Sequence, residues 1–305
     1  MSGSVGKAFG KVIVLGEHAV VYGEPALAGA LAAGCAVDVR KSEHGLPHLM
    51  LDTRVLEVSD ADNGVCKSMK IAQDAAGLGA LALDVTIRFD VPVGAGLGSS
   101  AAMAVALPRA MFAFAAKTLE TARLIELSTQ IERVFHGNPS GLDAHLARTG
   151  ELGLFTKKDG LQAIRAKEPV RLVIADTGVG RSTQTQVSNV AARRERLGRP
   201  IERTIEAIGE IARMGADAVT KGDLPRLGEL MNANQGLLSA LSVSSQEIEH
   251  LVHVARKAGA IGSKLTGAGG GGCIIALAPG KEEEVAASLR QHSKTVVITT
   301  LGATS

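Results

Sequence analysis

The sequence predicts an α+β fold, because strand-like and helix-like segments occur in mixed runs rather than in a repeating strand–helix–strand order. Its 305 residues suffice for one large domain or two ordinary ones, and 46% hydrophobic with 21% charged residues is typical of a globular protein. Glycine contributes 36 residues, whereas aromatic residues make up only 2%. Since no G-X-Y period accompanies them, collagen is excluded, and we expect the glycines to serve particular backbone conformations.

The first half begins with a buried strand at 12–15, a run of Val, Ile and Leu that Gly16 ends. Residues 83–91 alternate apolar and polar side chains, which indicates a half-buried strand. The stretch 101–116 carries Arg109 as its only charge, which favours a central buried helix with Pro108 as the residue where it would bend. Further helices are expected at 121–135 and from 142, on either side of a break at 137–141.

The second half opens with a strand at 172–175 and then becomes mainly helical. Apolar residues at helical spacing predict amphipathic helices around 201–212 and 224–231. The remaining elements are expected as a helix at 248–258, strands at 261–265 and 273–277, a helix at 282–289 and a strand at 295–300.

We place a domain boundary near residue 178, which gives an N-terminal domain at 1–178 and a C-terminal domain at 179–305. The change from a strand-containing half to a mainly helical half supports this position, although no Pro- or Ser-rich linker marks it. No internal repeat of 20 to 50 residues is visible.

Composition excludes several classes of partner. Lys plus Arg total 33 and Asp plus Glu total 31, so no general basic field attracts nucleic acid, and aromatic side chains for base stacking are scarce. The charge-free run 26–37 is shorter than the roughly 18 residues of a membrane span, and no leader-like segment opens the chain, so we expect a cytoplasmic protein. Three widely separated cysteines (Cys35, Cys66 and Cys273) indicate reduced, packed thiols.

The strongest local signal is a glycine-rich segment between the strand at 83–91 and the central helix, which we name the first glycine loop. Alternating glycines let backbone N–H groups turn inward as an anion-binding nest, and the N-terminus of the next helix adds its dipole. Phosphate is the expected ligand, although the loop lacks the lysine of a Walker A motif. The alternative is a tight turn capped by serine. The loop consists of Gly94, Ala95, Gly96, Leu97, Gly98, Ser99 and Ser100.

A second glycine loop, Thr266–Gly272, lies between two expected strands. It matches G-x-G-x-x-G, but a β-branched run follows where the dinucleotide fingerprint requires a helix, so we regard that match as accidental. Four consecutive glycines each cost about 0.5–1 kcal/mol of ordering relative to alanine. We therefore expect this backbone to lie close to a ligand or to the first glycine loop, with a merely permissive loop as the alternative.

Five charged or polar residues are candidates for chemistry: Lys11, Glu17 and His18 around the first strand, Glu132 on the helix at 121–135, and Asp143 after the break. Glu132 borders an apolar helix face, where a carboxylate needs an ionic partner or a metal. Asp143 follows a helix start and could simply complement the helix dipole. On local pattern alone, Lys11 would be a solvated or salt-bridged lysine and His18 a buried histidine with its hydrogen bonds satisfied.

Three segments in chain order resemble the three sequence motifs of the GHMP kinases, and the likeness spans essentially the whole chain. The segments are 10–23 (GKVIVLGEHAVVYG), 92–102 (PVGAGLGSSAA) and 264–273 (KLTGAGGGGC). The resemblance implies a two-domain GHMP kinase fold, with an N-terminal domain like the second domain of ribosomal protein S5 and a ferredoxin-like C-terminal domain.

Within that family, segments 16–23 and 136–143 (HGNPSGLD) are most similar to kinases that act on mevalonate. Segments 176–178 with 182–183, and 231–238, also resemble the short archaeal and bacterial members of this type. The resemblance implies ATP and Mg²⁺ as cofactors, and mevalonate as a small-molecule substrate that is phosphorylated on its primary hydroxyl in isoprenoid precursor synthesis. One departure is Phe9, where the family often has proline; it concerns a turn rather than the chemistry.

The resemblance also implies a role for each candidate residue. ATP phosphates would lie along the first glycine loop, and Ser100 and Glu132 would hold Mg²⁺. Asp143 would be the general base, and Lys11 would stabilise the alkoxide. By the same resemblance the substrate-binding residues are Lys11, Glu17, His18, Asp143 and Thr183, and the supporting second glycine loop contributes Gly267, Gly269 and Gly270.

Other functions remain open at this point. A sibling kinase would act on another small alcohol or on phosphomevalonate, and a non-catalytic ligand sensor would use the same fold. A nicotinamide-dependent oxidoreductase is the weakest alternative, because neither glycine loop lies in a strand–helix–strand unit. The sequence predicts neither a nucleic-acid partner nor a membrane, and it leaves a homodimer open.

Overall fold

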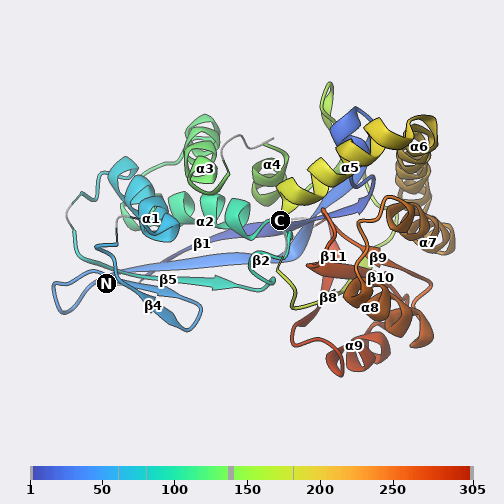
Figure 1. Ribbon diagram of the computed structural model, residues 1–305. Coiled ribbons are helices and arrows are strands. Elements are labelled where there is room, and N and C mark those ends of the chain that lie inside the picture. The colour runs from blue at the N-terminus through green and yellow to red at the C-terminus, as the bar shows by residue number, and fades with distance from the viewer. Residues whose placement is uncertain (1–2, 61, 80, 137–140, 181, 303–305) are drawn as a thin grey trace. The chain divides into compact units, whose positions relative to one another are not determined.

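The computed structural model describes residues 3–60, 62–79, 81–136, 141–180 and 182–302, which form an α+β fold as the sequence predicted (Figure 1). The chain divides into two compact units. The domain boundary expected near residue 178 stays a prediction. Unit 1 comprises Met1–Gly10, Ala33–Val93 and Gly98–Thr149, and unit 2 comprises Lys11–Ala32, Gly94–Leu97 and Gly150–Ser305.

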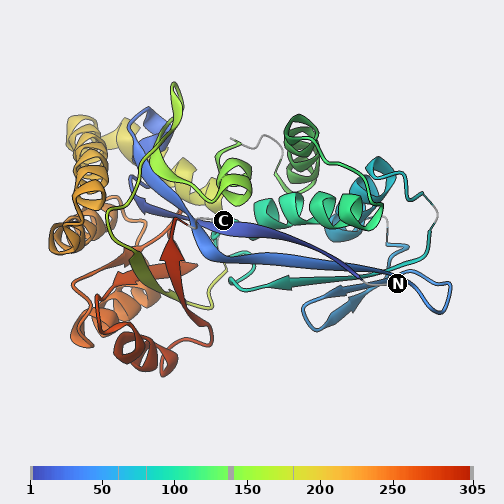
Figure 2. The ribbon, with the colours of Figure 1, turned by 180° about the vertical axis from the view of Figure 1, so that it is seen from behind.

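Unit 1 is a sheet with helices on one face. Its strand order is β4 (Arg54–Leu56), β3 (His48–Leu51), β5 (Leu83–Phe89) and then residues 35–41 of β2 (Ala26–Lys41), with the first part of β1 (Ser4–Leu15) also in this unit. Both views show α1 and α2 on the same face of these strands (Figures 1 and 2). The helices are α1 (Gly64–Ala75), α2 (Ser99–Phe114), α3 (Thr121–Phe135) and α4 (Leu142–Thr149).

Helix α2 is the buried centre of unit 1, as expected from its composition. It packs against α1, α3 and α4, and almost every residue from its start to Phe112 is buried. Small side chains allow β1 to approach it very closely: a Cβ atom built on Gly6 would lie 2.3 Å from the carbonyl oxygen of Ala106. The absence of a side chain at Gly6 therefore permits this close packing of the strand against the helix backbone.

Unit 2 contains a second set of strands with helices packed on them. Strands β11, β8, β10 and β9 are neighbours in that order, and residues 26–29 of β2 pair with β6 of the β6–β7 hairpin. Helices α8 and α9 pack on these strands, α7 packs on β9, and α6 packs on α7. The strands are β6 (Leu152–Thr156), β7 (Gly160–Ala163), β8 (Val170–Asp176), β9 (Gly262–Leu265), β10 (Cys273–Leu277) and β11 (Val296–Leu301). The helices are the 3₁₀ turn η1 (Ala19–Tyr22), α5 (Thr183–Leu197), α6 (Arg199–Lys221), α7 (Leu224–Ala240), α8 (Gln246–Lys257) and α9 (Glu282–Arg290).

One strand is longer than the sequence indicated, and another was not predicted. β1 begins at Ser4, before the apolar run at 12–15, and the Ala/Gly-rich segment from Ala26 forms most of the 16-residue β2, which we had not assigned as a strand. Alanine and glycine have low strand propensity. Pairing along β2 with β1, β5 and β6 supplies the hydrogen bonds that override this preference.

Two expectations from composition can be compared with the described part of the chain. Cys35, Cys66 and Cys273 are buried and form no disulfide in the described part of the chain, as predicted, and burial raises the pKa of the Cys35 thiol well above its usual value. None of the described helices combines the length and the apolar character that crossing a bilayer requires.

Candidate functional site

The first glycine loop has the backbone conformation that an anion-binding nest requires. Gly94, Gly96 and Gly98 all lie in the left-handed region, with φ of 76°, 87° and 72°. Alternation of these glycines with Ala95 and Leu97 turns N–H groups toward one side of the loop. Space does not explain Gly94, because a Cβ atom there would meet nothing within 4 Å; its conformation does.

The cap residue of the helix that follows this loop lies one position earlier than the predicted serine cap. Gly98 is the N-cap of α2 and makes no side-chain capping bond, while Ser99 and Ser100 are its first helical residues. The capped-turn alternative therefore lacks the side-chain bond that would support it. The amide groups and positive dipole end of a 16-residue helix lie directly after the nest.

Lys11 is joined to the first glycine loop through its backbone. Its N–H donates to the carbonyl oxygen of Leu97 at 2.9 Å, and Lys11 as a whole is only 9% exposed. Strand β1 therefore fixes a lysine next to the loop expected to bind phosphate.

In unit 1 the Ser100 side chain contacts His136, which lies one helical turn after Glu132 at the end of α3. The Ser100 hydroxyl lies 3.1 Å from Nε2 of His136, whose backbone N–H donates to the Glu132 carbonyl oxygen at 2.8 Å. Glu132 is only 3% exposed, and Asp143 lies in the first turn of α4. Residues 137–140, which belong to the predicted 136–143 motif, lie outside the described residues.

His18 occupies a strained turn after β1. Its φ of 63° is uncommon for a residue other than glycine, and Gly16 is also left-handed at 101°. The buried ring of His18 is anchored, with its Nε2 atom 2.9 Å from the carbonyl oxygen of Ala268 in the second glycine loop. The first and third motifs therefore meet within unit 2.

A buried ion pair accompanies this turn. The Lys264 ammonium donates to Oε1 of Glu17 and to the Leu265 carbonyl oxygen, and Asn234 donates to Oε2 of Glu17 at 3.0 Å. The side chains of both charged residues are 0% exposed. Burial lowers the pKa of Lys264, while the neighbouring Glu17 carboxylate opposes that shift.

No role was predicted for Lys264 from the sequence, although this residue lies in the third motif. A usable signal was present: a single lysine within a strand whose other residues are apolar or small requires a buried counter-charge. Both carboxylate oxygens of Glu17 accept hydrogen bonds within the protein, and its expected contact with substrate stays a prediction.

The second glycine loop lies against protein backbone. A Cβ atom on Gly269 would come within 2.1 Å of the Val243 carbonyl oxygen, and one on Gly271 within 2.5 Å of the Val179 carbonyl oxygen. These contacts are with the segments before α5 and α8, and the expected approach of a ligand or of the first glycine loop stays a prediction. Five glycines of this loop have positive φ: Gly267, Gly269, Gly270, Gly271 and Gly272.

Thr183 is less closely tied to these contacts. It is the first residue of α5, it is exposed, and it follows Ser182, whose side chain caps the helix by accepting a hydrogen bond from the Thr185 N–H at 3.2 Å. Its predicted role in substrate binding stays untested.

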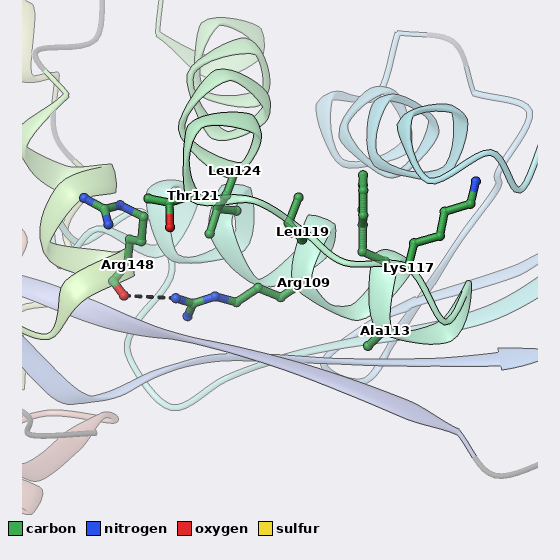
Figure 3. Close-up of a pocket in the computed structure, with 8 residues that line it drawn as sticks. Arg109, Ala113, Lys117, Leu119, Thr121, Leu124 and Arg148 are labelled. Atoms are coloured by element: carbon green, nitrogen blue, oxygen red, sulfur yellow. Dashed lines mark hydrogen bonds between the residues drawn. The ribbon is translucent and has the colours of Figure 1, made fainter.

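Unit 1 also has a cavity of about 410 Å³ that none of the predicted site residues lines (Figure 3). Arg109 crosses it, donating to the carbonyl oxygens of Lys7 at 2.6 Å and Arg148 at 3.0 Å. Burial lowers the pKa of Arg109. Because its guanidinium joins the start of β1 to the end of α4, Arg109 has a structural role here.

Comparison with known proteins decides the family. The model of the GHMP kinases N-terminal domain matches residues 63–150, and that of the GHMP kinases C-terminal domain matches residues 216–295. The chain belongs to the GHMP kinase family. Its α+β fold and the resemblance of its three motifs are thereby confirmed.

Relatives within the GHMP kinase family cover nearly all of the chain. A mevalonate kinase of Pyrococcus horikoshii is 35% identical over 304 residues, covering 92% of this chain and 90% of the relative. A mevalonate kinase of Aeropyrum pernix is 38% identical over 291 residues, covering 90% and 88%. The crystal structure of L. major mevalonate kinase in complex with R-mevalonate is similar, with a TM-score of 0.84, 28% identity and coverage of 100% and 97%.

The close packing of the second glycine loop predicts unequal costs for two substitutions of left-handed glycines. Gly269→Ala should destabilise the protein by about 3 kcal/mol, because it adds a clash with backbone to the conformational cost. Gly280→Ala, at φ 75° with nothing within 4 Å, should cost only about 1 kcal/mol. Denaturant unfolding of both variants measures the difference, and equal losses would contradict the packing described here.

Proposed function

We propose that this protein transfers the terminal phosphoryl group of ATP to the primary hydroxyl of mevalonate. The observation that carries the proposal is sequence identity of 35% and 38% to mevalonate kinases over about nine-tenths of the chain. The likeness in fold to a mevalonate kinase solved with R-mevalonate supports it further. The chain is accordingly a phosphotransferase that uses ATP and has an alcohol as acceptor.

In this proposal the first glycine loop receives the phosphates of ATP. Left-handed glycines at 94, 96 and 98, followed by the N-terminus of α2, offer backbone N–H groups and a positive dipole to a polyanion. No lysine of the Walker type lies in the loop, so in the proposal Lys11, held by its N–H bond to Leu97, supplies a cationic side chain.

Asp143 and Lys11 are proposed to act on the acceptor hydroxyl. The pKa of an alcohol lies far above 7, so the proton needs an acceptor and the developing alkoxide needs a positive charge. The Asp143 carboxylate would accept the proton, and the Lys11 ammonium would stabilise the alkoxide. Phosphoryl transfer passes through a loose transition state in which positioning and electrostatics supply most of the catalysis.

Mg²⁺ fits the residues proposed to hold it. Hydroxyl and carboxylate oxygens are the ligands that Mg²⁺ prefers, and Ser100 and Glu132 supply one of each within unit 1. Among the described residues there is no group of three His, Cys, Asp or Glu side chains that would hold a metal without other help. In the proposal, the cation would be bound by one or two protein ligands together with substrate phosphates, whose negative charge it would neutralise.

His18 is the proposed discriminator of the substrate, with Glu17 and Thr183 as the other residues named for substrate binding. The ring of His18 is buried and held at Ala268, so it is pre-oriented before any ligand arrives. A homodimer and a cytoplasmic location stay predictions.

A panel of alcohol acceptors tests the proposed function. Purified protein with ATP and Mg²⁺ should convert mevalonate to a phosphate monoester at least about 100-fold more efficiently than phosphomevalonate, homoserine or galactose, because a site built to bind one acceptor's polar groups leaves them unpaired with another. Product mass and coupled ADP release measure this. A preference for another alcohol would favour a sibling kinase, and ligand binding without ADP release would favour a sensor.

Replacement of Asp143 tests the proposed base. Asp143→Asn should lower kcat by about 100-fold or more, because an amide cannot accept the hydroxyl proton, while affinity for ATP changes by less than about 2-fold. The matched control is Asp62→Asn in the same unit, whose side chain is fully exposed, and it should keep normal activity. An active Asp143→Asn enzyme would remove Asp143 from the chemistry.

A further inference from the structure

The contacts of Lys264 and Glu17 link two distant segments of the chain. Lys264 lies on β9, at the start of the third motif, and Glu17 lies directly after β1. The Lys264 ammonium donates to the carboxylate and to the Leu265 carbonyl oxygen, and Asn234 of α7 donates to the other carboxylate oxygen at 3.0 Å. Ions without access to water persist only when paired and hydrogen-bonded, so these groups hold one arrangement.

Glu17 is flanked by two residues in left-handed conformations. Gly16 has φ 101° and His18 has φ 63°, and the latter is strained because its Cβ atom crowds the backbone. Strain of this kind persists only where surrounding contacts over-determine the conformation. Here the surrounding contacts are the fixed carboxylate of Glu17 and the bond between the His18 ring and Ala268.

Both anchors of the turn come from one short segment. Lys264 holds Glu17, and Ala268, four residues later, holds the ring of the adjacent His18. The segment is itself fixed, because the Leu265 N–H donates to the Gln235 side chain at 2.9 Å and the Thr266 hydroxyl donates to the Ile13 carbonyl oxygen at 2.9 Å.

We propose that Lys264 is a positioning residue that fixes, through Glu17, the backbone turn presenting the His18 ring to mevalonate. This inference rests on the proposed function. Lys264 itself is completely buried, so it acts through Glu17 and touches no substrate. The arrangement gives Glu17 a positioning role, and the substrate contact expected from the sequence stays a prediction.

The test replaces both charges together. Lys264→Met alone would leave an unpaired buried carboxylate and could fail to fold, whereas Glu17→Gln combined with Lys264→Met removes the two charges at similar volume. The paired variant should raise the KM for mevalonate by about 10-fold and change the KM for ATP by less than about 2-fold, since contacting groups couple by up to a few kcal/mol.

A double-mutant cycle shows whether the effect passes through His18. In a His18→Ala background, the same paired replacement should change the KM for mevalonate by less than about 2-fold, because the ring that it positions is absent. The matched control is Arg256→Met, which removes a cation bonded to the Ser263 carbonyl oxygen of the same strand and should leave both KM values unchanged.

Three results would overturn the proposal: an equal rise in both KM values, an unchanged KM for mevalonate in the paired variant, or a full 10-fold rise persisting without His18. Failure of the proposed function is a separate result, visible as a wild-type enzyme that does not phosphorylate mevalonate. The cycle is then measured with the alcohol that the acceptor panel identifies, and the same outcomes decide the role of Lys264.

Discussion

The buried pair of Lys264 and Glu17 is the constraint on which the arrangement of unit 2 depends. It joins residues 247 positions apart in sequence, and it does so where neither charge can be satisfied by water. A buried ion pair contributes little net stability compared with a pair of hydrophobic side chains. Any arrangement that separates its two charges, however, costs several kcal/mol of free energy, on the order of 3–5. We infer that its contribution is specificity of geometry: one position of the His18 turn relative to the second glycine loop.

Glycine has a different structural role in each of the two glycine loops. In the first, a Cβ atom on Gly94 would meet nothing within 4 Å, so its left-handed conformation is what requires glycine there. In the second, the loop is both left-handed and pressed against Val243 and Val179, so the absence of a side chain matters as well. Glycine thus serves backbone conformation in the first loop and both conformation and close packing in the second.

Much of the fold followed from local pattern, because periodicity and loop chemistry are local properties. The helix at 121–135 and the strand at 273–277 were predicted with the observed bounds. β2 was missed because its strand character comes from pairing with distant segments, which propensity does not record. For the site, the glycine loops and charged candidates were visible in the motifs, whereas the role of Lys264 required knowing that Glu17, far away in sequence, lies beside it.

The most direct test of this account is a crystal structure of the protein with a non-hydrolysable ATP analogue, Mn²⁺ in place of Mg²⁺, and mevalonate. The account predicts nucleotide phosphates on the N–H groups of Gly94–Ser100, an anomalous Mn²⁺ signal at Ser100 and Glu132, and mevalonate beside Asp143 and His18. Glu17 would remain bonded to Lys264, and the His18 turn would keep its left-handed backbone. Phosphates bound to the second glycine loop, or a His18 turn rebuilt around the ligand, would contradict it.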